Sequence, residues 1–194
     1  MRKFFFIPML ILFASAVMAQ NKPYYYNIPD TPKTYTAATV AARLVDGLGF
    51  RYFWATEGLT EKDLTFSPGD STRSIFATLE HIKDLTDILF NAANKKPTDF
   101  SAVPVKLGFA EIREKTLNNI KAASDLLKQP DVNLEEMDMI FLRVNGKTEF
   151  PFWNLVNGPI SDALWHIGQV VSFRRSSGNP LPNGVNVLRG TKTN

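Results

Sequence analysis

Two histidines and one aspartate are the residues whose types and spacing could do chemistry in this 194-residue chain. Asp162 and His166 lie four residues apart in DALWHIGQVVSFRR, a stretch that reads as a helix, so their side chains project side by side. Gln169 follows on the same face one turn later. His81, the only other histidine, lies in ATLEHIKDL, at the edge of the apolar face of another predicted helix.

A divalent metal ion is the partner that these side chains would share. A carboxylate and an imidazole that point into a core need partners, because burying either group alone is costly. His81 would supply a third ligand, and two histidines with one carboxylate match zinc hydrolase and non-haem iron sites. The alternative is structural: the helix dipole favours an acid in the first turn, and Asp162 would then form a simple ion pair with His166.

Other catalytic chemistry finds no support in the chain. The absence of cysteine excludes disulfides, thiolate zinc sites and cysteine nucleophiles. There is no G-x-S-x-G elbow and no phosphate-binding glycine loop. The serines of SFRRSSG lie near neither histidine in the sequence. We expect Arg174 and Arg175 to cap the C-terminus of their helix rather than to bind an anion.

The first residues, MRKFFFIPMLILFASAVMAQ, are typical of a secretory signal peptide. Arg2 and Lys3 precede an apolar run, and small residues stand before an expected cut ahead of Gln20. We therefore expect residues 1–19 to be removed and the mature protein to be exported, either to the periplasm or by secretion. The apolar run is too short for a membrane span, so none is expected after cleavage.

The mature chain is close to electrically neutral. Removal of residues 1–19 leaves 20 basic and 19 acidic residues. Nucleic acid is therefore not an expected partner, since no basic stripe is present. A mature length of 175 residues predicts one domain.

The hydrophobic periodicity predicts an all-α fold, a four-helix bundle in which each helix turns one apolar face to a shared core. In the first helix, an apolar stripe is expected to face inward. Val40, Leu44, Leu48 and Tyr52 recur in it at four-residue steps, and Val45 and Trp54 widen it. Ser74 is the expected N-cap of the second helix. The last helix starts at Gly158-Pro159, or begins earlier and kinks at Pro159. The predicted helices span about 36–57, 75–96, 108–128 and 158–178.

The remaining segments connect these helices. Residues 20–35 are expected to form an extended lead-in, 58–73 a connection that ends at Pro68-Gly69, and 181–194 a polar tail. Asn145-Gly146 stands between two β-favouring runs and predicts a small β-hairpin between the third and fourth helices. The expected pairing is Met139–Val144 with Thr148–Phe152, around a type I′ turn.

Two stretches, STRSIFATLEHI and HIGQVVSFRRSSGNP, resemble the DinB/YfiT-like superfamily over about residues 36–180. The resemblance implies a four-helix bundle with a metal site of typically three histidines. His81 matches the ligand of the second helix, and His166 matches the second ligand of the last helix. Asp162 stands where the family has its first histidine of that last motif, so the donor spacing is kept while the charge and hardness of the site change.

The resemblance also implies a class of function. Members of the superfamily are described as metal-dependent hydrolases or as transferases of thiol cofactors, and thiol transfer fits an exported protein less well, since low-molecular-weight thiols act in the reducing cytosol. We therefore expect His81, Asp162 and His166 to bind zinc, nickel, iron or manganese, with Gln169 in support, and to activate water against a small-molecule substrate. The alternative is a non-catalytic bundle that binds a small molecule or a protein. Neither interpretation fixes the oligomeric state, and both are compatible with a homodimer.

Overall fold

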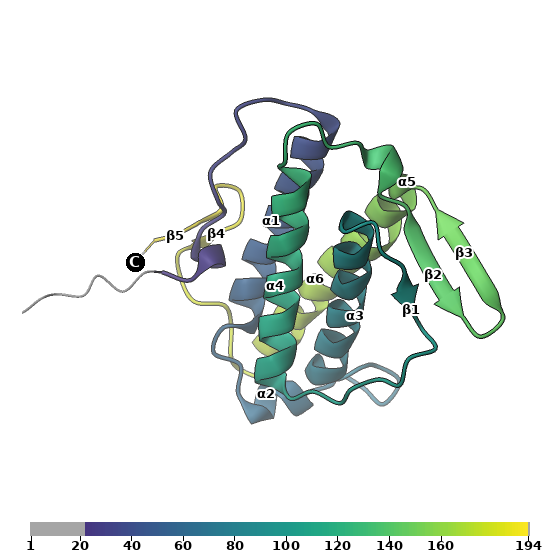
Figure 1. The fold of residues 1–194 in the computed structure, drawn as a ribbon. Coiled ribbons are helices and arrows are strands. Elements are labelled where there is room, and N and C mark those ends of the chain that lie inside the picture. Colours follow the sequence, from purple (N-terminus) through teal and green to yellow (C-terminus); the bar gives the residue numbers. More distant parts are fainter. Residues whose placement is uncertain (1–21, 194) are drawn as a thin grey trace, which may run out of the picture.

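The computed structural model describes residues 22–193, so the predicted signal peptide lies outside the described residues. The described chain is mostly helical, with two small sheets on opposite sides of the helices (Figure 1). Its long helices α1 and α3 each pack against both α4 and α6. No described helix combines the length and the apolar character that a membrane crossing requires. The bounds are Ala37–Thr56 for α1, Ile75–Ala93 for α3, Phe109–Leu127 for α4 and Ser161–Ser176 for α6.

Side-chain caps fix where the first three long helices begin. The Thr36 hydroxyl accepts from the backbone N–H of Thr39, and the Thr39 hydroxyl accepts from Thr36 N in return. Ser74 accepts from Ala77 N at 3.2 Å, as the sequence predicts. The carboxylate of Glu111 accepts from Gly108 N at 2.8 Å and starts α4. These bonds satisfy N–H groups that the first turn of a helix leaves without partners.

The inward face of α1 is only partly the predicted one. Leu48 and Tyr52 are fully buried, whereas Val40 and Leu44 are exposed. The reason is geometric, because a four-residue step advances about 40° around a helix and a stripe of such steps drifts off the buried face. Val45 and Trp54, which widen the predicted stripe, are buried as expected, and Ala41 occupies a buried position in the first half of the helix that the stripe did not include.

Three segments predicted as irregular contain regular structure. The connection 58–73 holds a short helix, α2 (Glu61–Thr65), which Thr60 caps with Asp63. The lead-in contains the 3₁₀ turn η1 (Tyr24–Tyr26). The tail forms a hairpin of β4 (Val185–Asn186) and β5 (Thr191–Lys192). These elements are five residues long or shorter, too short for the periodicity of a sequence to reveal.

The lead-in and the tail bind each other across one side of the helices. Ile28 N donates to Gly190 O at 2.7 Å, and Lys192 N donates to Asn27 Oδ1 at 2.9 Å. Tyr25 lies directly against Gly49 of α1, where a Cβ atom would collide with its ring. The lead-in is therefore an ordered part of the domain.

The predicted β-hairpin is present between α4 and α6. Strand β2 (Met139–Arg143) pairs antiparallel with β3 (Gly146–Phe150), and Thr98–Asp99 adds the short parallel strand β1 on the other edge of β2. The turn sits one residue earlier than predicted, at Val144-Asn145, and Arg143 pairs with Gly146. The predicted type I′ turn is wrong, since Asn145 does not have a positive φ. A 3₁₀ turn, η2 (Leu134–Glu136), precedes the hairpin.

Replacing Gly146 by alanine should destabilise the hairpin locally by about 1–3 kcal/mol, because Gly146 has a φ of 131° that other residues rarely adopt. Amide hydrogen exchange of β2 and β3 would report the change as faster opening. Gly69→Ala is the matched control, since Gly69 lies in an open loop without a positive φ. Equal exchange in both variants would contradict this prediction.

The last helical segment begins before Gly158 and deviates at Pro159, which confirms the second of the two predicted starts. A short helix, α5 (Phe152–Leu155), continues through a π turn, η3 (Val156–Ile160), directly into α6. Pro159 lies inside the π turn, where its ring and missing N–H disrupt the α-helical hydrogen bonds. Asp162 is the second residue after this irregular turn.

Arg174 holds the ends of α1 and α6 together, in a role that the sequence did not predict. Its side chain is fully buried and donates to Trp54 O at 2.9 Å and to Ala55 O at 3.0 Å, near the C-terminus of α1. It also donates to Asn179 O at 2.7 Å. Arg174 therefore donates hydrogen bonds to carbonyl groups of α1. Its neighbour Arg175 is exposed.

Asp63 extends this network from α2. The carboxylate is buried and accepts from Ser177 Oγ, from Asn179 Nδ2 at 2.7 Å and from Thr60 N at 2.9 Å. Burial alone raises the pKa of Asp63, but these hydrogen bonds outweigh it and hold the pKa below its usual range. Ser177, the last serine of SFRRSSG, thus has a structural role.

Candidate metal centre

The contact between α3 and α6 brings the three predicted ligands together. His81 comes from α3, while Asp162 and His166 come from the first two turns of α6. Their donor atoms all lie within 4.8 Å of one another. The sequence prediction that these residues converge is therefore confirmed, and the group could hold a metal ion.

The carboxylate of Asp162 lies between the two imidazoles. Its Oδ2 is 3.3 Å from His81 Nε2, and its Oδ1 is 3.3 Å from His166 Nε2. The two rings are 4.6 Å apart between centroids and nearly perpendicular, at 87°. Both Nε2 atoms thus point at the same small region from two helices, as ligands of one ion would.

Gln169 fixes the tautomer of His166. Its Oε1 lies 2.7 Å from His166 Nδ1, and because an amide oxygen only accepts hydrogen bonds, Nδ1 carries a proton. In a neutral imidazole, Nε2 then presents a lone pair toward a carboxylate oxygen, and two acceptors facing each other need a cation or a proton between them. The donor set therefore fits a divalent cation.

The centre is sheltered on one side and open on the other. The side chain of His166 is 11% exposed, that of His81 29% and that of Asp162 43%. A site with three protein ligands and an open side leaves room for water or a substrate. Trp165, next to His166 in the sequence, is 73% exposed and adds an apolar surface on the outer side of α6.

Replacing Gln169 by leucine should weaken metal binding about 10- to 100-fold, because partners that orient a ligand have effects of this size. The leucine keeps the bulk but cannot accept the Nδ1 proton of His166. Titration with zinc, followed by calorimetry, would measure the change. Ser172→Ala, on an exposed position of the same helix, is the control, and equal affinities for the two variants would contradict the role of Gln169.

A second polar cluster, which the sequence did not predict, lies in the core. Asp46 of α1 is fully buried, accepts from Ser124 Oγ at 2.6 Å and pairs with Lys128 Nζ at 2.7 Å. The Tyr25 hydroxyl donates to the same carboxylate at 3.4 Å. The only feature of the sequence that could have indicated this cluster is the position of Asp46, an acidic residue within a mostly apolar helix. Because its partners are a serine, a lysine and a tyrosine of the lead-in, we interpret it as structural.

Comparison of the chain with protein-family models, with curated proteins and with solved structures finds no match in any of the three. The resemblance to the DinB/YfiT-like superfamily accordingly rests on the two histidine stretches and the order of the helices.

Proposed function

We propose that the protein is an exported DinB-like four-helix bundle that binds a divalent metal ion through His81, Asp162 and His166 and acts as a hydrolase or transferase on a small molecule. The observation that carries the proposal is the convergence of both Nε2 atoms on the two oxygens of one carboxylate, at 3.3 Å each. The mutual packing of the four long helices is consistent with the bundle.

Each side chain of the candidate centre has its own role in the proposed function. Bound at the three donors, a divalent metal would supply Lewis acidity and lower the pKa of water. His166 is oriented by Gln169 so that its Nε2 faces the centre. Asp162 offers one carboxylate oxygen to each side, and His81 closes the site from α3. The exposed side of the centre, where the Asp162 side chain is 43% exposed, would admit the substrate.

A non-catalytic binding module is the second candidate. Asp162 already lies near both imidazoles, so a protonated histidine pair could satisfy the carboxylate without metal. The three residues would then hold α3 against α6 and contribute no chemistry.

Metal uptake separates the two candidates. Purified protein would be stripped with a chelator, dialysed against zinc, nickel, iron and manganese salts in turn, and analysed for bound metal. The proposal predicts about one ion per chain for at least one metal, followed by metal-dependent cleavage of a member of an ester, amide and phosphoester panel. Uptake of none of the four metals would remove the basis of the enzyme proposal and favour the binding module.

A further inference from the structure

A second candidate site lies on α1, where two arginines flank a glycine on successive turns. Arg43, Gly47 and Arg51 follow at four-residue steps and therefore share one face. Gly47 has no side chain, so the Arg51 guanidinium lies directly against its backbone, at the edge of a hollow on this face. A Cβ atom at Gly47 would lie only 3.2 Å from Arg51 Nη1.

The two guanidinium groups retain most of their hydrogen-bonding capacity. Arg51 Nη1 donates to Gly47 O at 3.0 Å, and Arg43 Nη1 donates to Pro29 O at 2.7 Å. Within residues 22–193, neither arginine pairs with a carboxylate, in contrast to Arg113 and Glu57. Since a guanidinium has five N–H donors, both groups can accept an anion as a partner.

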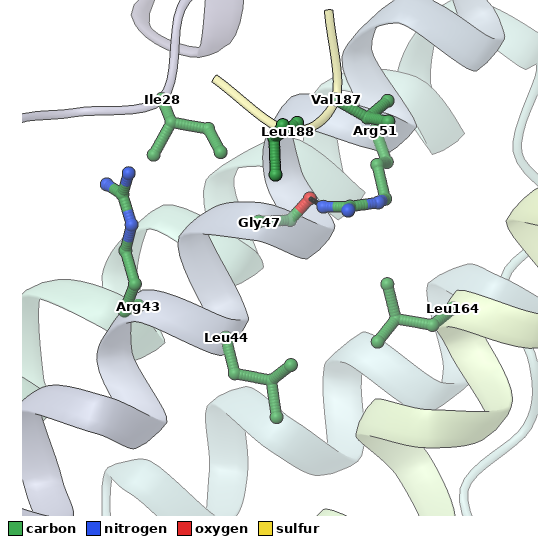
Figure 2. Close-up of a pocket in the computed structure, with 8 residues that line it drawn as sticks. All are labelled: Ile28, Arg43, Leu44, Gly47, Arg51, Leu164, Val187 and Leu188. Atoms are coloured by element: carbon green, nitrogen blue, oxygen red, sulfur yellow. Dashed lines mark hydrogen bonds between the residues drawn. The ribbon is translucent and has the colours of Figure 1, made fainter. Parts of the chain in front are cut away.

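The walls of the hollow are aliphatic. It has a volume of about 360 Å³ and lies between α1, α6 and the tip of the C-terminal hairpin. Figure 2 shows the Arg51 guanidinium lying over Gly47, with Leu188 on one side and Leu44 and Leu164 on the other. Leu188 is 93% exposed, so its apolar side chain is available for contact with a ligand. The aliphatic lining residues are Ile28, Leu44, Leu164, Val187 and Leu188.

The hollow is separate from the metal centre. Leu164 is the only residue of α6 that lines it, and it stands two residues after Asp162. Two residues correspond to a rotation of about 200°, so the hollow and the centre lie on different sides of α6. Binding in the hollow can therefore be tested without metal.

We propose that this hollow binds an aliphatic carboxylate, such as a medium-chain fatty acid. The planar guanidinium of Arg51 matches a carboxylate in a two-point hydrogen bond, and Arg43 adds positive charge at the edge. The alkyl chain lies against Leu44, Leu164 and the hairpin tip. The volume falls within the range of small-molecule pockets, roughly 300–1,000 Å³.

Calorimetric titration of the metal-free mature protein with decanoate tests this proposal. Decanol, which lacks the charge, and butyrate, which lacks the chain, should each bind at least about tenfold more weakly than decanoate. Arg51→Gln should lose at least about tenfold in decanoate affinity, and Leu188→Ser should weaken decanoate binding with little effect on butyrate. Arg175→Gln, an exposed arginine outside the hollow, should bind like the wild type.

Circular dichroism of each variant would confirm that it is folded. Because Leu188 is exposed, its replacement should leave the core packing unchanged.

Three results would each overturn the proposal. The first is no decanoate binding by the wild type up to about 1 mM. The second is decanol binding as tightly as decanoate. The third is equal decanoate affinity in Arg51→Gln, Leu188→Ser and Arg175→Gln.

Discussion

His166→Ala should lower metal affinity at least about 100-fold while the protein stays folded. The variant removes one of the three proposed ligands, and the loss of a ligand costs at least as much affinity as the loss of a group that only orients one. It also leaves Gln169 without the Nδ1 proton that its Oε1 accepts. The fold should persist, because the core of the four long helices is built from aliphatic and aromatic residues elsewhere. Competition of the stripped protein with a zinc-sensitive dye would measure the affinities.

Two companion variants sharpen the result. Ser172→Ala, exposed on the same helix, should bind metal like the wild type. His81→Ala should resemble His166→Ala although it comes from α3, since both imidazoles face the same carboxylate. Full metal binding by His81→Ala would restrict the site to α6 and contradict the three-ligand centre.

Arg174→Met should reduce the free energy of unfolding by about 3 kcal/mol. Its guanidinium donates to Trp54 O, Ala55 O and Asn179 O from a fully buried position, and methionine would leave these carbonyls without donors. For a domain of this size, the melting temperature should fall by roughly 6–12 °C. Urea unfolding followed by circular dichroism would give the free energy of unfolding and its dependence on urea concentration.

Arg175→Met provides a matched comparison one residue away. Arg175 is exposed, so the exchange should change stability by less than about 0.5 kcal/mol. If both variants unfolded at the same urea concentration, the carbonyl contacts of Arg174 would not contribute to stability in the way that its burial implies.

The sequence predicted the long helices well, because their apolar periodicity is repeated over four or more turns. The helix 108–128 appears as Phe109–Leu127, and the Ser74 cap stands where it was expected. The elements of five residues or fewer are too short to show a repeated apolar pattern. The helix Glu61–Thr65 depends on reciprocal bonds between Thr60 and Asp63, a pattern too common in loops to be diagnostic.

The site was predictable where its chemistry is local. Asp162, His166 and Gln169 lie on one helix, so their spacing alone places them together. That His81 lies opposite them depends on how α3 packs against α6, which the two histidine stretches suggested only through their resemblance to a family. The two arginines of α1 could not be recognised as a site from the sequence, since the hairpin that closes their hollow comes from residues more than 130 positions later.

The bonds from Ile28 to Gly190 and from Lys192 to Asn27 also bear on how the chain could be rearranged. Both ends of the described chain lie on the same side of the helices (Figure 1), so a short linker could join them. New ends could then be opened at the exposed turn Val144-Asn145, which includes none of the candidate metal ligands and forms no part of the hollow. In such a circular permutant, His81 and His166 would exchange their order along the chain while keeping their places in space.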